Sequence, residues 1–196
     1  MNRAVWQTVL SRVATDKLLW VQSVCFALLT AWGARCSVPL PYTPVPVTLQ
    51  TLFVLLSGMV LGARWGAAAQ AQYLLMGFLG LPVFAAGGGF WYLFNPRGTG
   101  GYLLAYPLAA YVVGAMVERT PKRTLASYLL AGAAGTAVIH AIGATWLATF
   151  LHLSAVQAVV MGVVPFLLGD AVKIAVAALC ARGVHWLSST VKQGDR

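Results

Sequence analysis

The most restrictive feature of this sequence is an apolar run from Ala155 to Ala181 that contains two residues of opposite charge, Asp170 and Lys173. A helix needs about 20 such residues to cross a bilayer, so the run is long enough. An ionised side chain near the membrane centre costs roughly 2.5–3.5 kcal/mol on insertion scales. Because a spacing of three places both side chains on one helix face, the pair is either an internal ion pair between helices or part of a polar ligand site within the membrane.

Composition places the whole chain in the membrane class. Hydrophobic residues make up 60% of it and charged residues only 9%, whereas a soluble domain carries about 25% charged residues. The length of 196 residues leaves room for about six spans with short loops. The net charge of +9 could indicate nucleic-acid binding, but in so apolar a chain it favours basic loops that face the cytoplasm. We therefore expect an all-α integral membrane protein in a lipid bilayer, with no nucleic acid as partner.

Six apolar stretches predict six transmembrane helices. Residues 1–17 lack a clean apolar core, so we expect a retained first span. The expected parts are a cytoplasmic segment over 1–17, a membrane domain over 18–187 and a cytoplasmic tail over 188–196. The two longest stretches exceed a minimal span, and the last could kink at Pro165. The stretches are Leu18–Ala34, Val47–Leu61, Trp65–Leu79, Tyr102–Val117, Leu125–Phe150 and Ala155–Ala181.

Basic residues orient these spans. If the N-terminus is cytoplasmic, ten of the 13 basic residues fall on the inner side, Arg35 and Arg97 fall on the outer side, and Lys173 lies within a span. This positive-inside bias predicts an even number of helices, both termini in the cytoplasm, and a multi-pass protein of the cytoplasmic (inner) membrane. The inner basic residues are Arg3, Arg12, Lys17, Arg64, Arg119, Lys122, Arg123, Arg182, Lys192 and Arg196.

The two long outer loops are unusual in composition. Residues 37–46 contain four prolines, which lack a backbone donor and stiffen the segment toward extended polyproline geometry. Residues 80–101 are rich in glycine, which lets the backbone pack close to a ligand and move. A stiff loop beside a mobile, glycine-rich one is typical of a pocket wall beside a lid. Both could instead be plain connections, although most connections are only about 4–6 residues long.

Motifs for catalysis and metal binding are scarce. The sequence has no GxxxxGK[ST] loop for ATP and no HExxH, and its cysteines have neither metal nor disulfide spacing. Only four acidic residues occur, so a mechanism with paired carboxylates is unsupported. His140 lies within the fifth stretch and could face a pore, but a hydrogen-bonded packing role is favoured, while His152 and His185 lie near span ends. We expect no enzyme, no metal and no cofactor.

Further polar residues within or beside the spans suit a small-molecule pocket. Each alone is better explained by a hydrogen bond between helices, worth about 0.6 kcal/mol in membrane proteins. Together with Asp170 and Lys173 they suggest convergent polar groups in an apolar wall, as in a ligand site. They are Thr48, Gln50, Thr51, Gln70, Gln72 and Tyr73.

Small residues recur at a helical spacing in the first span. Ala27 and Ala31 lie one turn apart, which lets another helix approach closely. Spacing alone favours a contact within the chain and a contact with another subunit equally.

Five sequence blocks resemble the BioY family, the biotin-binding S components of energy-coupling factor transporters. In chain order they are PLPYTPVPVTLQTL (Pro39–Leu52), LLSGMVLGARWGA (Leu55–Ala67), YLLMGFLGLPVFAAGGG (Tyr73–Gly89), GTGGYLLAYPLAA (Gly98–Ala110) and LLGDAVK (Leu167–Lys173). They cover nearly the whole chain, and PVPVTLQT and GLPVFAAGG are the specific ones. One departure is NPRGTGGY (Asn95–Tyr102), with an apparent insertion around Arg97, where the family usually has GPTGGY.

The resemblance implies a six-helix membrane fold that captures biotin from outside and works with a transmembrane coupling protein and two ABC-type ATPases. Such partners would account for the missing ATP loop. It also implies that Ala27 and Ala31 match the family's docking motif for the coupling protein. It implies as well that Asp170 and Lys173 belong to the polar site for biotin. The full set of predicted substrate-binding residues is Asp170, Lys173, Gln50, Tyr73, Phe84, Asn95 and Tyr102.

Biotin's chemistry suits these residues. Its ureido ring has two N–H donors and one carbonyl acceptor, and its tail ends in a carboxylate. Asp170 can accept from an N–H, and Lys173 can donate to the ureido oxygen or to the carboxylate. The aromatic residues expected to cover the apolar parts are Tyr73, Phe84, Trp91 and Tyr102.

Three other functions are weighed. A proton- or ion-coupled transporter of a small carboxylated vitamin could use Asp170 as its proton site, but the internal repeats common in that class are not evident. A membrane enzyme has too few reactive groups. A biotin transporter that acts alone or as an oligomer stays open.

Overall fold

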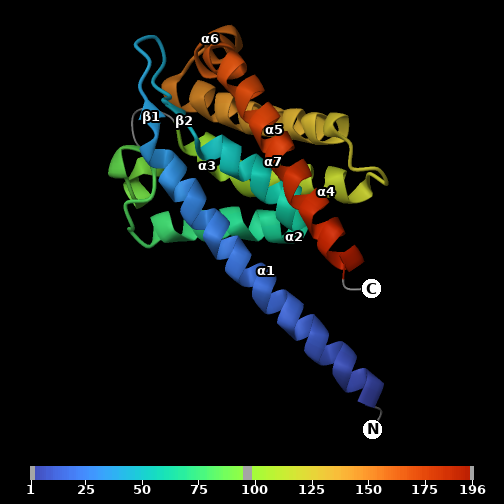
Figure 1. Cartoon of the computed structure of the whole chain (residues 1–196). Helices are drawn as coiled ribbons and strands as arrows, with labels where there is room; N and C mark the ends of the chain where they lie inside the picture. The colour runs from blue at the N-terminus through green and yellow to red at the C-terminus, as the bar shows by residue number, and fades with distance from the viewer. Residues whose placement is uncertain (1–2, 95–98, 195–196) are drawn as a thin grey trace.

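The computed structural model describes residues 3–94 and 99–194, and this part of the chain is almost entirely helical (Figure 1). Within it, five helical segments are long and apolar enough to cross a membrane: Asp16–Arg35, Gln50–Phe78, Gly100–Arg119, Leu125–Leu151 and Ala155–Leu187. The elements are α1 (Arg3–Arg35), β1 (Ser37–Val38), β2 (Val47–Thr48), α2 (Gln50–Phe78), η1 (Ala85–Gly87), η2 (Phe90–Phe94), α3 (Gly100–Leu104), α4 (Tyr106–Arg119), α5 (Leu125–Leu151), α6 (Ala155–Gly162), η3 (Val164–Phe166) and α7 (Leu167–Gly194).

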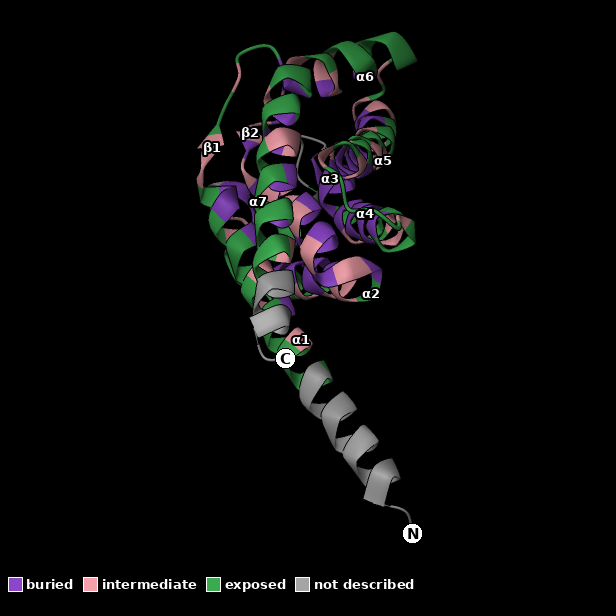
Figure 2. Ribbon diagram, turned by 45° about the vertical axis from the view of Figure 1, so that its right-hand side comes forward, coloured by how far each residue is buried: buried purple, intermediate pink, exposed green. Residues whose placement is uncertain are grey.

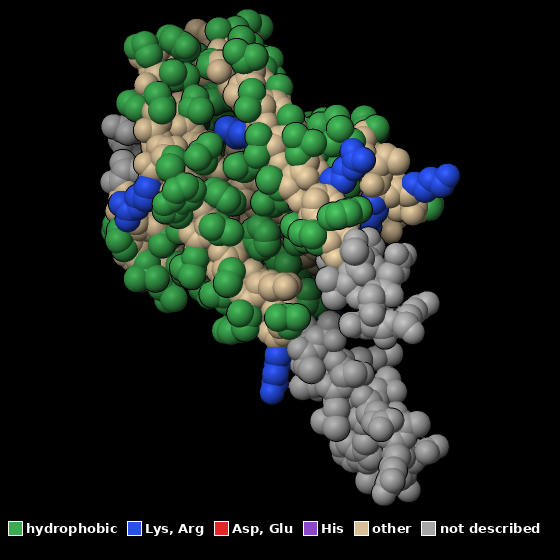
Figure 3. Space-filling view, in the orientation of Figure 1, with side chains coloured by type: hydrophobic (Ala, Val, Ile, Leu, Met, Phe, Trp, Pro, Cys, Tyr) green, Lys and Arg blue, Asp and Glu red, His purple; other side chains and the backbone are tan. Residues whose placement is uncertain are grey.

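Large apolar side chains cover the outside of the helices. Trp32 on α1, Leu130 on α5 and Leu168 on α7 are 56%, 65% and 82% exposed. Figure 2 shows buried residues on the inner faces of the helices, and Figure 3 shows a molecular face dominated by hydrophobic side chains. A soluble monomer rarely exposes apolar surface on this scale, so the protein is a multi-pass membrane protein.

The chain of α2 reverses its direction at Gly62. The backbone there has φ 82° and ψ −177°, a conformation that glycine adopts without strain. A Cβ on Gly66 would lie 2.8 Å from the Cα of Gly58, and Gln70 Nε2 donates to Ser57 Oγ at 3.1 Å. The two arms of α2 therefore pack against each other. They correspond to the second and third predicted stretches, which explains why six predicted stretches become five long helices.

Glu118, at the end of α4, stabilises this reversal. Its Oε1 accepts a hydrogen bond from the backbone N–H of Ala63 at 2.9 Å. The first N–H groups of a helix lack partners within the helix, and Ala63 begins the second arm of α2. Glu118 thus caps that arm from a neighbouring helix.

The run Ala155–Ala181, predicted as a single span, is interrupted between α6 and α7. Ser154 and Gln157 form a capping box at the start of α6, and the short η3, which contains Pro165, separates α6 from α7. Proline lacks the N–H that would continue the helical ladder, so the kink predicted at Pro165 is confirmed. In Figure 2, α6 turns away from the axis of α7. Asp170 therefore lies in the first turn of α7, not in the middle of a helix.

The first span agrees with the prediction, whereas the proline-rich loop differs from it. Helix α1 begins at Arg3, and its part that could cross a membrane, Asp16–Arg35, matches the predicted stretch Leu18–Ala34. The loop 37–46 is not one straight extended segment: β1 at its start pairs antiparallel with β2, which follows the loop, Ser37 with Thr48 and Val38 with Val47. Between the strands the chain turns at residues 41–42. A proline at the second position of a turn favours such a bend, which explains why this loop is a hairpin rather than a straight segment.

Two clusters of buried apolar residues form the core. The first lies near the β1–β2 end and includes Tyr73, Phe84, Tyr102, Tyr106 and Leu147. The second packs α2, α4, α5 and α7 together and includes Leu55, Met59, Val113, Tyr128 and Ala177.

Candidate functional site

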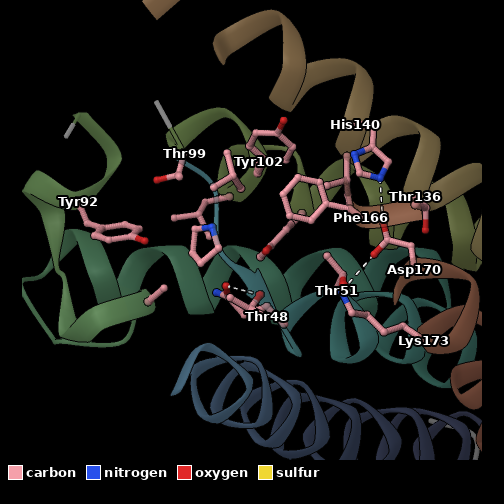
Figure 4. Close-up of a pocket in the computed structure, with 17 residues that line it drawn as sticks. Thr48, Thr51, Tyr92, Thr99, Tyr102, Thr136, His140, Phe166, Asp170 and Lys173 are labelled. Atoms are coloured by element: carbon pink, nitrogen blue, oxygen red, sulfur yellow. Dashed lines mark hydrogen bonds and ion pairs between the residues drawn. The ribbon is translucent and has the colours of Figure 1, made fainter. Parts of the chain in front are cut away.

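A pocket opens at the β1–β2 end of the helix bundle. It holds about 580 Å³ of empty space, its open mouth included. Its wall combines the β1–β2 hairpin, the start of α2, the glycine-rich segment, α3, α4, α5, η3 and α7 (Figure 4). The lining residues are Val45, Pro46, Thr48, Gln50, Thr51, Ala85, Tyr92, Thr99, Tyr102, Leu103, Tyr106, Thr136, Ile139, His140, Phe166, Asp170 and Lys173.

Asp170 is the centre of the charged end of this pocket. Its Oδ1 lies 3.1 Å from Nζ of Lys173, and its Oδ2 lies 2.7 Å from Nε2 of His140 on α5. Both members of the Asp170–Lys173 pair are buried, 5% and 8% exposed. The first turn of a helix favours a negative side chain, which suits Asp170. An ammonium group has three donors, so the bond to Asp170 leaves Lys173 with further donors beside the pocket.

Unpaired polar atoms gather at the pocket. Among the residues whose side chains are described, five buried polar side-chain atoms have no hydrogen-bond partner. Four of them belong to pocket residues: Thr51 Oγ1, Thr99 Oγ1, Thr136 Oγ1 and His140 Nδ1. Leaving a buried polar group unpaired costs about 1–3 kcal/mol. Such a concentration is what a pocket for a ligand with several polar groups requires.

Gln50 lines the pocket as predicted, but its amide is already bonded. Its Oε1 accepts from Thr48 Oγ1 at 3.0 Å, and its Nε2 donates to the hydroxyl of Tyr73. Tyr73 and Phe84 are fully buried and meet edge to face at 5.4 Å between ring centroids. Neither lines the pocket. They lie behind its wall, where the hydroxyl of Tyr73 accepts the hydrogen bond from Gln50.

Tyr102 lines the pocket through its ring. Its hydroxyl donates to the carbonyl oxygen of Gly162 at 2.7 Å, which ties α3 to the end of α6. Of the other predicted residues, Trp91 is 80% exposed and outside the pocket. Asn95 and the insertion around Arg97 lie outside the described residues.

Both unusual loops reach the pocket. Val45 and Pro46 come from the proline-rich loop, and Ala85, Tyr92 and Thr99 come from the glycine-rich segment. The guanidinium of Arg35 donates to the carbonyl oxygen of Pro82 at 2.6 Å and so joins the end of α1 to that segment. The two loops therefore line one cavity, as the wall-and-lid interpretation requires.

The small-residue face of α1 packs within the chain. Ala27 is completely buried in the first core cluster, and Ala31 packs against that cluster from a partly exposed position. At Ala27 the close approach is therefore made within the chain, and docking of a partner at this face stays a prediction. Ala31 stays a docking candidate.

Sequence reasoning missed His140 as a pocket residue, because it assigned this side chain to packing. It also missed Thr136, one helical turn earlier on α5. A signal was present: Thr136 and His140 are four residues apart in a predicted span and therefore share one helix face.

Comparison with known proteins agrees with the sequence resemblance. Residues 6–190 match the BioY family. The chain is 43% identical over 162 residues to the biotin transporter BioY of Thermotoga maritima, covering 82% of this chain and 92% of that protein. It is 41% identical over 157 residues to a probable biotin transporter BioY of Pyrococcus horikoshii, covering 80% and 89%.

A solved structure shares the fold. It is the crystal structure of an S-component for biotin from an ECF-type ABC transporter, which superposes with a TM-score of 0.79. The alignment covers 88% of this chain and 93% of that chain at 20% identity. Because the family match spans residues 6–190 and these relatives are more than 40% identical, the chain belongs to the BioY family.

Proposed function

We propose that this protein takes up biotin across the cytoplasmic membrane, as the substrate-capture subunit of an energy-coupling factor transporter. The observation that carries the proposal is the pocket, where Asp170, Lys173 and four unpaired polar atoms converge in an apolar wall. The relatives named as biotin transporters supply the identity of the ligand.

The pocket matches the chemical character of biotin. Its polar groups can meet the ureido ring and the carboxylate, since it offers the Asp170 carboxylate as acceptor and the Lys173 ammonium as donor. Apolar residues such as Val45, Leu103 and Phe166 stand beside them and can cover the hydrocarbon parts of the ligand. This combination is the usual make-up of a small-molecule site.

We further propose six membrane crossings with both termini in the cytoplasm, the two arms of α2 serving as two of the crossings. The support is the distribution of basic residues, ten on the inner side against two on the outer. In this orientation α1 runs outward and α7 runs inward. The first turn of α7, with Asp170, then lies at the outer side, and so does the β1–β2 hairpin. The pocket would open to the outside, as capture of an external nutrient requires.

The proposed partners are a transmembrane coupling protein and two ABC-type ATPases. The support is that the sequence contains no P-loop of its own, so ATP would have to be hydrolysed by other subunits. Ala31 is the proposed docking residue that keeps some exposed surface.

Binding of radiolabelled biotin to the purified protein tests the proposal. We expect saturable binding, with biotin recovered unchanged. ATP-dependent uptake in cells should require genes for the coupling protein and its ATPases. A protein that does not bind biotin would refute the function. Full uptake without those genes would keep biotin as the ligand but refute the partners.

A further inference from the structure

His140 is the one histidine of the three in this chain whose side chain lines the pocket. Its Nε2 lies 2.7 Å from Oδ2 of Asp170. Its ring meets Tyr102 edge-on, with 6.4 Å between centroids, and lies 6.2 Å from the ring of Phe166 (Figure 4). These three contacts fix the position of the imidazole and leave Nδ1 as the nitrogen without an assigned role.

The bond to Asp170 decides which nitrogen carries the proton. An ionised carboxylate only accepts hydrogen bonds, so Nε2 must be the donor. Asp170 also accepts from Lys173 at 3.1 Å, and the charges of these two residues balance. In the neutral form of His140 the single ring proton is then on Nε2. In the neutral imidazole, Nδ1 therefore bears a lone pair and is an acceptor.

Nδ1 of His140 is buried and has no hydrogen-bond partner among the described residues. One helical turn earlier on α5, the hydroxyl of Thr136 is in the same situation, and both residues line the pocket. Two unpaired polar groups on one helix face therefore border the cavity. Unpaired buried groups destabilise a protein, and a ligand in this cavity is the available source of partners.

We propose that His140 is a ligand-binding residue of this pocket: its Nδ1 accepts a hydrogen bond from an N–H group of the ligand, while its Nε2 holds Asp170. This inference rests on the proposed function, because the N–H groups of biotin belong to its ureido ring. His140 then recognises the ureido ring through this hydrogen bond. A site with a buried acceptor discriminates against a ligand that lacks the matching donor, because the acceptor would stay unpaired.

Two substitutions separate the two nitrogens of His140. His140→Gln places an amide near the Nε2 position, so it can still donate to Asp170 but offers nothing at Nδ1. His140→Asn places an amide oxygen near the Nδ1 position but loses the bond to Asp170. The matched control is His185→Gln, because His185 bonds Tyr128 at 2.8 Å and lies outside the pocket.

The test measures the affinity of each purified protein for biotin and for the two biotin derivatives that carry a methyl group on one ureido nitrogen. The unaltered protein should prefer biotin over at least one derivative. His140→Gln should bind biotin about tenfold more weakly, the order expected for one lost ligand hydrogen bond, and should lose that preference. His140→Asn should keep the preference, and His185→Gln should behave like the unaltered protein.

Several outcomes overturn the proposal. One is a folded His140→Gln protein that binds biotin as tightly as the unaltered protein. Another is an equal loss of affinity for all three ligands, which would mean a purely structural role. If His140→Gln does not fold, two other results decide. The proposal fails if the unaltered protein binds biotin and both methylated derivatives equally well. It also fails if His140→Asn loses the preference for biotin. Failure of the unaltered protein to bind biotin at all is a separate result, since it removes the proposed function as well.

Discussion

Two buried polar clusters in this membrane domain contrast sharply. In the Gln70 cluster (Thr30, Ser57 and Gln70), the amide of Gln70 accepts from Thr30 Oγ1 at 3.3 Å and donates to Ser57 Oγ at 3.1 Å. The hydroxyl of Ser57 also donates to the carbonyl oxygen of Val54, and the single proton of the Thr30 hydroxyl is shared between Gln70 and the carbonyl oxygen of Phe26. At the pocket, by contrast, Thr51, Thr99 and Thr136 have no partner for their hydroxyls among the described residues.

The contrast separates polar residues that join helices from those available to a ligand. Both clusters contain threonine side chains whose hydroxyl oxygens are buried. The Gln70 cluster closes its hydrogen bonds within the chain and so binds α1 to the two arms of α2. The pocket leaves several groups open around one cavity. Unsatisfied, convergent polar groups therefore mark the site, whereas polarity alone does not.

The largest effects are expected at the Asp170–Lys173 pair. Asp170→Asn and Lys173→Met each leave a buried partner unsatisfied, and each should weaken biotin binding by about 1–3 kcal/mol, or about 5- to 160-fold in dissociation constant. Titration of the purified variants with biotin measures this loss, and thermal melting in detergent reports folding.

The double variant distinguishes binding from mere ion pairing. If Asp170 and Lys173 only stabilise one another, making both changes should restore stability and leave biotin affinity near that of the unaltered protein. A folded double variant with normal biotin affinity would mean that Asp170 and Lys173 only stabilise the helices, as the Gln70 cluster does, and do not bind the ligand.

Thr136→Val should move stability and affinity in opposite directions. Valine has nearly the same shape but lacks the unpaired hydroxyl, so the melting temperature should hold or rise. Biotin affinity should fall about 2- to 13-fold, the range for one hydrogen bond worth about 0.5–1.5 kcal/mol. Thr30→Val in the Gln70 cluster is the matched control, where a lower melting temperature with unchanged affinity is expected. The same behaviour at Thr136 would contradict its place in the site.

The sequence predicts the fold well where the physical signal is local. Apolar stretches, basic loops and Pro165 indicate the helices and the break before α7. The reversal at Gly62 is harder to see, because its cause is non-local: close contact between Gly58 and Gly66 and a cap from Glu118 on another helix. Similarly, nothing in the spacing of Ala27 and Ala31 tells whether the helix that approaches them belongs to the same chain.

For the site, charge is the stronger guide and aromaticity the weaker one. Asp170 and Lys173 stand out because charges are costly in a membrane, and the structure places both at the pocket. Tyr73 and Phe84 were predicted from their chemistry, but depth in the core, which sequence does not reveal, puts them behind the wall. The role of His140 depends on Asp170, 30 residues away, so its own neighbours in sequence could not show it.

Tyr73→Phe tests a residue that lies behind the pocket wall and bonds a pocket residue, Gln50. Loss of the hydroxyl leaves the buried amide of Gln50 without its acceptor, which should lower the free energy of unfolding by about 1 kcal/mol. Because Tyr73 does not line the pocket, biotin affinity should change less than it does in Thr136→Val. Melting curves and biotin titration on the same samples compare the two effects. A larger loss of affinity than in Thr136→Val would mean that Tyr73 contacts the ligand directly.

The smallest effect on biotin affinity is expected in the Gln70 cluster itself. Gln70→Leu removes two hydrogen bonds between helices, but Thr30 and Ser57 keep their bonds to Phe26 and Val54 carbonyl oxygens. No hydroxyl is then left unpaired, so the free energy of unfolding should fall by only about 0.6 kcal/mol per lost bond. A small drop in melting temperature would measure this loss. Biotin affinity should be unchanged, because this cluster does not line the pocket. A clear loss of biotin affinity in Gln70→Leu would show that the Gln70 cluster is coupled to the pocket. The distinction between polar groups that join helices and polar groups that bind the ligand would then fail.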